Sequence, residues 1–170
     1  MSYDQLWAPW RLSYIADATD SKKNEETDCF LCRYRDSDAD AENFVVARSQ
    51  RSITVLNRYP YNNGHLLIAP LEHKASLAEL DDDEALDSLR ELKRMSALLQ
   101  RVLSPEGFNI GLNLGQVAGA GLPGHLHWHV VPRWSGDTNF MPVLGSIKVI
   151  PQSLESLYGL LRSACDECDS

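Results

Sequence analysis

Three of the 5 histidines in the chain stand at alternate positions, at His125, His127 and His129. Apolar residues fill the positions between and after them, and Pro132 closes the run. Imidazole transfers protons, attacks electrophiles and binds metals near neutral pH. Strict alternation with β-branched and aromatic residues predicts a strand, on which residues two apart share a face roughly 7 Å apart. We therefore expect the three imidazoles to form a row on one face of a sheet, where they share a task.

A glycine-rich loop precedes this row. Asn113 and Gln116 lead into the loop, and Gly119 and Gly121 lie within it. Backbone N–H groups beside glycine can approach an anion closely, and amide side chains add hydrogen-bond donors. The loop therefore predicts a phosphate site next to the histidines.

Strands and one long helix must position these residues. Short apolar runs predict strands at 44–47, 52–57, 65–69 and 108–114, with a late edge strand at 146–150. The acidic run 81–84 predicts a helix N-terminus. A stripe of apolar residues then predicts that this helix faces the sheet: Leu86, Leu89, Leu92, Met95, Leu99 and Val102. Residues 154–161 predict a short terminal helix, so the fold class is α+β with a mostly antiparallel sheet of about five strands.

Length and composition limit the alternatives. The 170 residues predict a single domain over 1–170, made of an aromatic arm and Cys-x-x-Cys segment (1–43), a core (44–134) and a C-terminal extension (135–170). The net charge of −8 argues against nucleic acid as a partner. No apolar run is long enough to span a membrane, and no secretion signal is evident, so we expect a cytoplasmic protein with reduced thiols.

The motif His125-Leu126-His127-Trp128-His129-Val130-Val131 resembles that of the histidine triad family of nucleotide hydrolases and transferases. The stretch 56–65 and the Asn113-x-Gly115 pair are also similar to that family, and the resemblance runs from about 44 to 134. The flanks at 6–11 and 131–140 look like the bacterial branch that includes diadenosine tetraphosphate phosphorylases.

The resemblance implies a HIT-like fold, a homodimer and covalent catalysis on an adenine nucleotide. His127 would attack the α-phosphorus and form a nucleotidyl-histidine intermediate. His129 would bind the phosphoryl oxygens and assist the leaving group, with support from His65. The nucleotide-binding residues implied are Asn57 at the ribose and, at the phosphates, Asn113, Gln116, His129 and loop amides near Gly119 and Gly121.

One departure concerns the residues just before the triad. Several branches of the family carry a serine or glutamine there, whereas this chain has Gly121-Leu122-Pro123-Gly124 and no hydroxyl. Protonation of the leaving group would then depend on His129, His65 or Gln116. Arg133 follows the row and would either bind an incoming phosphate or lie on a charged surface rim.

Two Cys-x-x-Cys pairs, Cys29 with Cys32 and Cys165 with Cys168, are metal or redox candidates in a reducing compartment. The first pair supplies half of a tetrahedral zinc site, and the resemblance adds His73 and His125 as the other ligands. A four-cysteine site and a chain without metal are the alternatives. The second pair lies in a tail, 163–170, that we expect to be mobile.

The functional prediction is an enzyme that cleaves a phosphoanhydride of an adenine nucleotide, first of all a diadenosine tetraphosphate phosphorylase. A nucleoside phosphoramidate or dinucleoside polyphosphate hydrolase is the alternative enzyme. A zinc-stabilised nucleotide-binding protein without turnover is a second alternative. A metallohydrolase with all three histidines as ligands is disfavoured, because side chains spaced roughly 7 Å apart in a row converge poorly on one ion.

Overall fold

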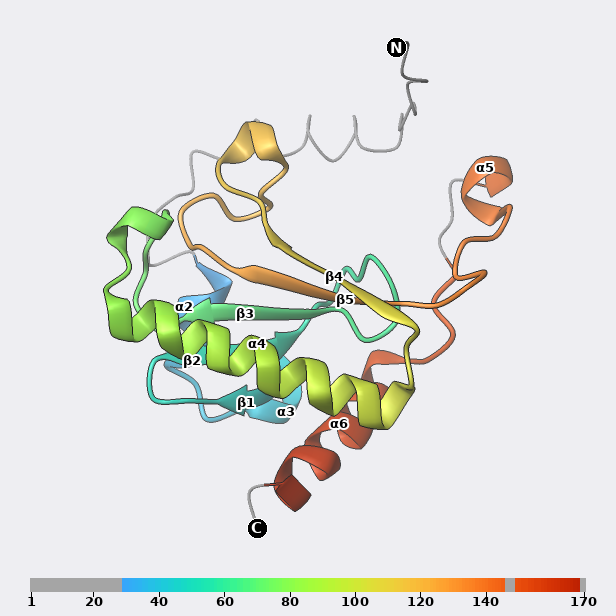
Figure 1. The fold of residues 1–170 in the computed structure, drawn as a ribbon, viewed down its shortest axis with the longest axis horizontal. Helices are drawn as coiled ribbons and strands as arrows, with labels where there is room; N and C mark the ends of the chain where they lie inside the picture. The colour runs from blue at the N-terminus through green and yellow to red at the C-terminus, as the bar shows by residue number, and fades with distance from the viewer. Residues whose placement is uncertain (1–28, 146–148, 169–170) are drawn as a thin grey trace.

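Figure 1 shows the fold as a computed structural model, which describes residues 29–145 and 149–168. Within these residues, five strands form an antiparallel sheet in the order β1-β2-β3-β5-β4. The strands are β1 (Val45–Arg48), β2 (Ser52–Leu56), β3 (Leu66–Pro70), β4 (Gly107–Leu112) and β5 (Trp128–Arg133). The predicted α+β class and the five antiparallel strands are confirmed.

Two long helices pack on one face of the sheet. The 22-residue helix α4 crosses strands β2, β3 and β5, and α6 lies against α4 and β1 (Figure 1). The helices are α2 (Phe30–Arg35), α3 (Asp40–Asn43), α4 (Asp82–Leu103), α5 (Met141–Gly145) and α6 (Leu154–Cys168), with 3-10 turns η2 (Leu77–Glu79) and η3 (Gln116–Ala118). Both long helices were predicted, although α6 continues well past residue 161 and the short helices were not foreseen.

Alternation along the strands divides the interior into two layers. On the helical face, Val130 of β5 packs with Met95 of α4. On the other face, Leu67 of β3 packs with Leu31 of α2. Because Leu67 is the cross-strand partner of His129, His129 shares the face that α2 covers. The sheet therefore separates the helical layer from the layer that carries the histidines.

The start of α4 agrees with the predicted cap. The Asp81 carboxylate accepts from the Glu84 backbone N–H, and the Glu84 carboxylate accepts from the Asp81 backbone N–H, both at 2.8 Å. This reciprocal arrangement satisfies two N–H groups that a helix leaves without partners. Glu84 is buried and also accepts from Lys74 Nζ at 2.6 Å, so the cap ties the helix to the segment after β3.

The predicted inward stripe of α4 is wrong over the first two turns. Leu86 and Leu89 are 45% and 55% exposed, respectively. The buried side chains there are polar instead: Glu84, which binds Lys74, and Ser88. From the third turn on the predicted stripe is confirmed, because Leu92, Met95 and Leu99 are buried against the sheet.

Two predicted segments fall at least partly outside the described residues. The aromatic arm at 6–15 lies wholly outside them, and so does part of the edge strand predicted at 146–150; residues 149 and 150 belong to no strand. Among the described helices, none is both long and apolar enough to cross a membrane.

Candidate active site

A chain of hydrogen bonds fixes the protonation of His65 and His129. The backbone N–H of Tyr61 donates to Nδ1 of His65 at 3.0 Å. Since a backbone N–H can only donate, neutral His65 carries its proton on Nε2. That N–H donates to Nδ1 of His129 at 2.9 Å, so the proton of neutral His129 lies on Nε2.

The turn before His65 depends on glycine. Gly64 has a φ of +74°, and a Cβ there would lie 2.7 Å from Leu103 Cδ1. Asn57 lies at the end of β2, where its Oδ1 accepts from the Tyr59 backbone N–H at 2.9 Å and its Nδ2 lies 3.2 Å from Nδ1 of His65. The structure thus brings Asn57 next to His65, and both side-chain atoms of Asn57 already have partners in the turn.

The two ring nitrogens of His127 have different roles: one is hydrogen-bonded to the main chain and the other has a free lone pair. Its Nδ1–H donates to the main-chain oxygen of His125 at 2.8 Å, which leaves the lone pair of Nε2 without a proton. The side chain is buried, and burial lowers the pKa of His127 from its ordinary value. A neutral imidazole held in this tautomer is prepared for nucleophilic attack.

His129 lies beside His127, with ring centroids 5.1 Å apart. Burial and the proximity of His127 lower the pKa of His129 to about 4. The ring of Tyr61 stacks on His129 with centroids 5.5 Å apart and an interplanar angle of 22°. His129 is therefore neutral at pH 7 and can donate through Nε2.

Asn113, which follows β4, contributes a second donor. Its Nδ2 lies 3.4 Å from Nε2 of His129 and 3.4 Å from the carbonyl oxygen of Gly119. Two N–H donors cannot bond to each other, so the amide and the imidazole together present donors to the same space. Paired donors of this kind suit the oxygens of a phosphoryl group.

The remaining predicted phosphate residues lie in the loop between β4 and His125. Gln116 begins the η3 turn, and Gly121, which follows that turn, is exposed. Gly119 has a φ of +89°, in the left-handed region that favours glycine. The carbonyl of Gly119 faces Asn113, which connects this loop to His129.

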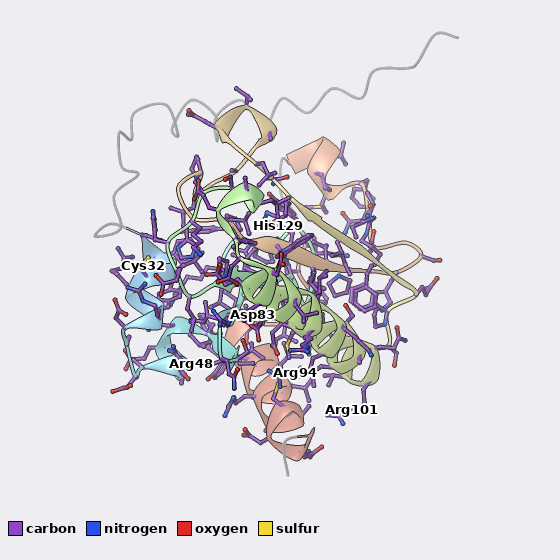
Figure 2. All side chains as sticks on the ribbon, turned by 60° about the vertical axis from the view of Figure 1, so that its left-hand side comes forward. Cys32, Arg48, Asp83, Arg94, Arg101 and His129 are labelled. Carbon is purple, nitrogen blue, oxygen red and sulfur yellow. The ribbon has the colours of Figure 1, made fainter. Side chains whose placement is uncertain are left out.

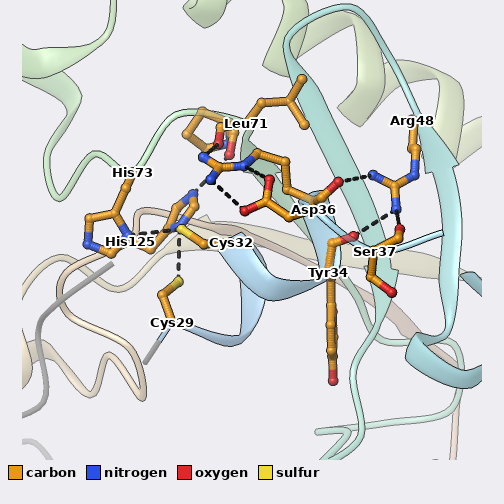
Figure 3. Close-up of polar contacts among 11 residues, drawn as sticks. Cys29, Cys32, Tyr34, Asp36, Ser37, Arg48, Leu71, His73 and His125 are labelled. Atoms are coloured by element: carbon orange, nitrogen blue, oxygen red, sulfur yellow. Dashed lines mark hydrogen bonds and ion pairs between the residues drawn. The ribbon is translucent and has the colours of Figure 1, made fainter. Parts of the chain in front are cut away.

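The first histidine of the row turns away from the other two. Nδ1 of His125 lies 3.2 Å from Sγ of Cys29 and 3.5 Å from Sγ of Cys32, and Nδ1 of His73 lies 3.3 Å from Sγ of Cys32. Figure 3 shows these four side chains converging at the start of α2. The expectation of one shared task for the three histidines is therefore wrong: His125 belongs to a cysteine–histidine cluster.

The four predicted ligands fit a tetrahedral metal ion. Their ligand atoms all lie within 4.8 Å of one another. Zinc bonds of about 2.0–2.3 Å at tetrahedral angles would place donor atoms roughly 3.3–3.8 Å apart, close to the spacings above. Nε2–H of His125 donates to the Pro70 carbonyl at 2.9 Å, which leaves Nδ1 free of a proton and available as a ligand.

Arginine side chains hold the cysteine segment on the sheet. Arg48 of β1 donates to the carbonyl oxygens of Tyr34 at 2.8 Å and Ser37 at 2.9 Å, at the C-terminal end of α2 (Figure 3). Arg35 donates to the Leu71 carbonyl at 3.0 Å. These bonds join the C-terminal end of α2 to β1 and to the residue after β3, and so fix the orientation of the helix.

The alternative of a metal site made of four cysteines is wrong. Cys165 is 1% exposed and packs in the helical layer between α4 and α6, whereas Cys29 and Cys32 pack on the opposite face of the sheet. The tail expected to be mobile is helical through residue 168. The metallohydrolase alternative also lacks support. Figure 2 shows Cys32 separate from His129. Among the described residues, the group of side chains that could hold a metal includes neither His127 nor His129.

Sequence reasoning missed the residues that hold the Tyr61 turn. Asp137 accepts from Nδ2 of Asn62 at 2.8 Å and from Nε of Arg133 at 2.6 Å. Nη1 of Arg133 donates to Oδ1 of Asn109 at 2.7 Å. The Arg133 side chain is thus 46% exposed and bonded within the protein, which agrees with the second of its two predicted roles, a charged surface rim. Turn residues such as Asn62 were visible in the sequence, but no local pattern signals that two turns 75 residues apart meet.

A five-stranded antiparallel sheet with adjoining imidazoles and a donor-lined space defines a nucleotide-processing class of site. The chain matches the HIT domain over residues 38–136, more than half of its length, and it belongs to the HIT family. The predicted resemblance is confirmed.

Particular relatives are similar over most of the chain. An AP-4-A phosphorylase of Mycobacterium tuberculosis is 40% identical over 161 residues, covering 94% of this chain and 83% of the relative. An asymmetrical bis(5'-nucleosyl)-tetraphosphatase of Schizosaccharomyces pombe is 30% identical over 72% of this chain and 69% of its own. A zinc-bound histidine triad family protein from Mycobacterium smegmatis has a similar fold, with a TM-score of 0.69 and 24% identity over 85% of this chain and 98% of that chain.

Proposed function

We propose that this chain is a diadenosine tetraphosphate phosphorylase, which forms ATP and ADP from diadenosine tetraphosphate and inorganic phosphate. The similarity to the mycobacterial AP-4-A phosphorylase over nearly the whole chain supports the substrate class. The observation that carries the chemistry is the tautomer of His127, whose Nδ1–H is held by the His125 carbonyl while Nε2 is left as a nucleophile.

The first step is the attack of His127 Nε2 on the α-phosphorus. A nitrogen–phosphorus bond forms, the bond to the bridging oxygen breaks, and ATP leaves with the electron pair of that bond. The imidazole becomes positively charged, and its Nδ1–H remains on the His125 carbonyl, which stabilises the charge. His129 Nε2–H and the Asn113 amide donate to the phosphoryl and leaving oxygens as charge develops on them.

The second step transfers the adenylyl group to inorganic phosphate. A phosphate oxygen attacks the phosphorus, the bond to His127 breaks, and ADP is released with His127 neutral again. Arg133 is not the phosphate ligand in this proposal, because its guanidinium is bonded to Asp137 and Asn109 and the Asp137 carboxylate offsets its charge. Asn113, His129 and the loop amides near Gly119 and Gly121 serve both steps, with Gln116 as a further donor.

Asn57 is proposed to contact the ribose of the transferred nucleotide. It lies beside His65 at the strand end, and a carbonyl oxygen retains a second lone pair for a ribose hydroxyl. Its bond to the Tyr59 N–H would keep that oxygen oriented.

Zinc is the metal proposed for Cys29, Cys32, His73 and His125, because two thiolates and two imidazoles at these spacings suit a closed tetrahedral site. When bound, zinc would supply structural cross-linking and no open position for substrate. The four ligands would join α2 to the segments after β3 and before β5. Both thiols must be reduced for this role, which fits the expected cytoplasmic location.

Product analysis tests the reaction. Purified protein with diadenosine tetraphosphate and phosphate should yield equal amounts of ATP and ADP, with labelled phosphate recovered as the β-phosphate of ADP. Formation of AMP and ATP at a rate indifferent to phosphate would instead establish the hydrolase alternative. Binding of the nucleotide without any product would establish the non-catalytic alternative.

A homodimer is part of the proposal. Strand β4 is at the edge of the sheet, and Ile110 on its helical face is 47% exposed. The exposed Leu86 and Leu89 of α4 add apolar surface on the same side of the sheet. Among the described strands β4 has no neighbour on its outer side, and such an edge flanked by exposed apolar side chains favours pairing with a second copy of this chain.

A further inference from the structure

A cavity lies on the histidine face, beyond the catalytic pair. Its volume is about 240 Å³, and it is lined mainly by Tyr61, Asn109, Val131, Arg133, Asp137 and Thr138. None of these residues has a role in the two chemical steps described above. The cavity therefore needs an explanation of its own.

The cavity begins where the catalytic pair ends. Val131 follows His129 by two residues on β5, so both side chains point to the same face of the sheet. Asn109 is the cross-strand partner of Val131 on the edge strand β4. The ring of Tyr61 stacks on His129 and also forms a wall of the cavity. A substrate that reaches past His129 enters this space.

The charges of the cavity disfavour a phosphate. The Arg133 guanidinium forms two hydrogen bonds with the Asp137 carboxylate, at 2.6 and 3.0 Å. The ion pair leaves no net positive charge, and the carboxylate would repel an anion. The other groups suit an uncharged aromatic ligand: a partly exposed ring of Tyr61, the apolar side chain of Val131, and the polar side chains of Asn109 and Thr138. Aromatic stacking with a few amide and hydroxyl contacts is how proteins hold nucleobases.

The distance along the strand agrees with a dinucleoside polyphosphate. Val131 lies four residues beyond His127, which is about 13 Å in an extended chain. With the α-phosphorus at His127, the remaining phosphates of a tetraphosphate chain can cover this distance and deliver the second nucleoside to the cavity. We propose that the cavity at Tyr61, Asn109 and Thr138 binds the nucleoside of the departing nucleotide. This inference rests on the proposed phosphorylase function. It identifies the second nucleoside as the part of the substrate that distinguishes a dinucleotide from a mononucleotide.

A pair of substrates isolates this contact. Diadenosine tetraphosphate and adenosine 5'-tetraphosphate carry the same phosphate chain, and only the first has the second nucleoside. The wild type should show the higher kcat/KM with diadenosine tetraphosphate. Asn109→Met places a larger apolar side chain at the cavity and removes the amide, so it should lower the ratio of the two kcat/KM values about tenfold, the scale of a lost base contact. The rate with adenosine 5'-tetraphosphate should change little.

Gln100→Met is the matched control, because it makes a similar replacement on α4, across the sheet from the cavity. It should leave the ratio unchanged. A wild type without preference for the dinucleotide would overturn the inference, and so would an Asn109→Met variant that slows both substrates equally or neither. The ratio is independent of the acceptor, so production of AMP in place of ADP would contradict the phosphorylase proposal and leave this measurement interpretable.

Discussion

His127 combines two properties that a covalent catalyst needs: a nitrogen with a free lone pair and an opposite N–H bonded to the main chain. Replacing His127 with Ala should reduce turnover by more than about a thousandfold, beyond what loss of general acid–base help alone produces. Nucleotide binding and the unfolding temperature should remain close to wild type, because the proposed role is bond formation. Assays of ATP and ADP release check the rate.

Trapping of labelled nucleotide gives the complementary measurement for His127. The wild type should retain acid-labile label on quenching, and His127→Ala should retain none. Label on the variant would assign the nucleophile to another residue.

His129 carries a prediction about pH. Its pKa in the folded chain is about 4, below the ordinary value of 6.5, because burial and His127 disfavour its charged form. As pH falls from 6.5 to about 4, the unfolded chain therefore binds a proton at this position and the folded chain does not. The contribution of neutral His129 to the free energy of unfolding is complete at neutral pH and declines across this window.

Urea denaturation at a series of pH values measures this effect. The wild type should lose more stability between pH 6.5 and about 4 than His129→Gln does, because the variant lacks the titrating imidazole. Equal slopes for the two proteins would show that the group facing His65, His127 and Asn113 titrates normally in the folded state.

At the residue scale, the reactive histidines could be predicted from the sequence, but the residues that position them could not. Alternation placed His127 and His129 beside each other, and the resemblance supplied the ligands that cluster with His125. The role of Tyr61 depends on a backbone N–H and a ring orientation, and that of Asp137 on contacts between distant turns. Neither leaves a periodic signal, because both arise only when the sheet is assembled.

Among the elements, α2 depends most on the proposed metal. Its N-cap Cys29 and its Cys32 are buried, and the helix has only six residues, too few for stability by itself. Metal analysis should find about one zinc per chain, absent in Cys29→Ser and Cys32→Ser and retained in Cys165→Ser. Chelation should lower the unfolding temperature of the wild type towards that of the first two variants. Zinc loss in Cys165→Ser alone would reverse the assignment.

Helix α4 shows why patterns of apolar residues give incomplete answers at the element scale. Its N-terminal cap was predictable from local chemistry, since Asp81 and Glu84 bond within one turn. Its inner face was predictable only from Leu92 on, because Glu84 and Glu91 are buried through partners that periodicity does not reveal. The order of strands in the sheet likewise results from pairing over long separations, such as β3 with β5.

At the scale of the whole molecule, the sheet has a face with the histidines and a face covered by helices. The proposed dimer uses the edge strand β4 and the exposed apolar residues on the helical side. Leu86→Lys combined with Ile110→Lys should shift the protein from dimer to monomer, because a charged group buried at an interface lacks compensation. Light scattering after gel filtration measures the mass. Leu160→Lys on α6 is the control, since Leu160 has a similar exposure of 44% but lies on another element. A wild-type protein that is monomeric at micromolar concentration would contradict the dimer.

The alternation at β5 also limits how the gene can change in length. His127 and His129 point to one layer, while Trp128 and Val130 contribute to the core of the other. Insertion or deletion of a single codon within 127–131 would exchange the two sets, placing imidazoles among the helices and tryptophan in the nucleotide site. The turn at 49–51 between β1 and β2 carries no residue of the site, so a change of length there has no such consequence. Length variation during the divergence of this lineage should therefore accumulate in loops of that kind and be purged from the strand.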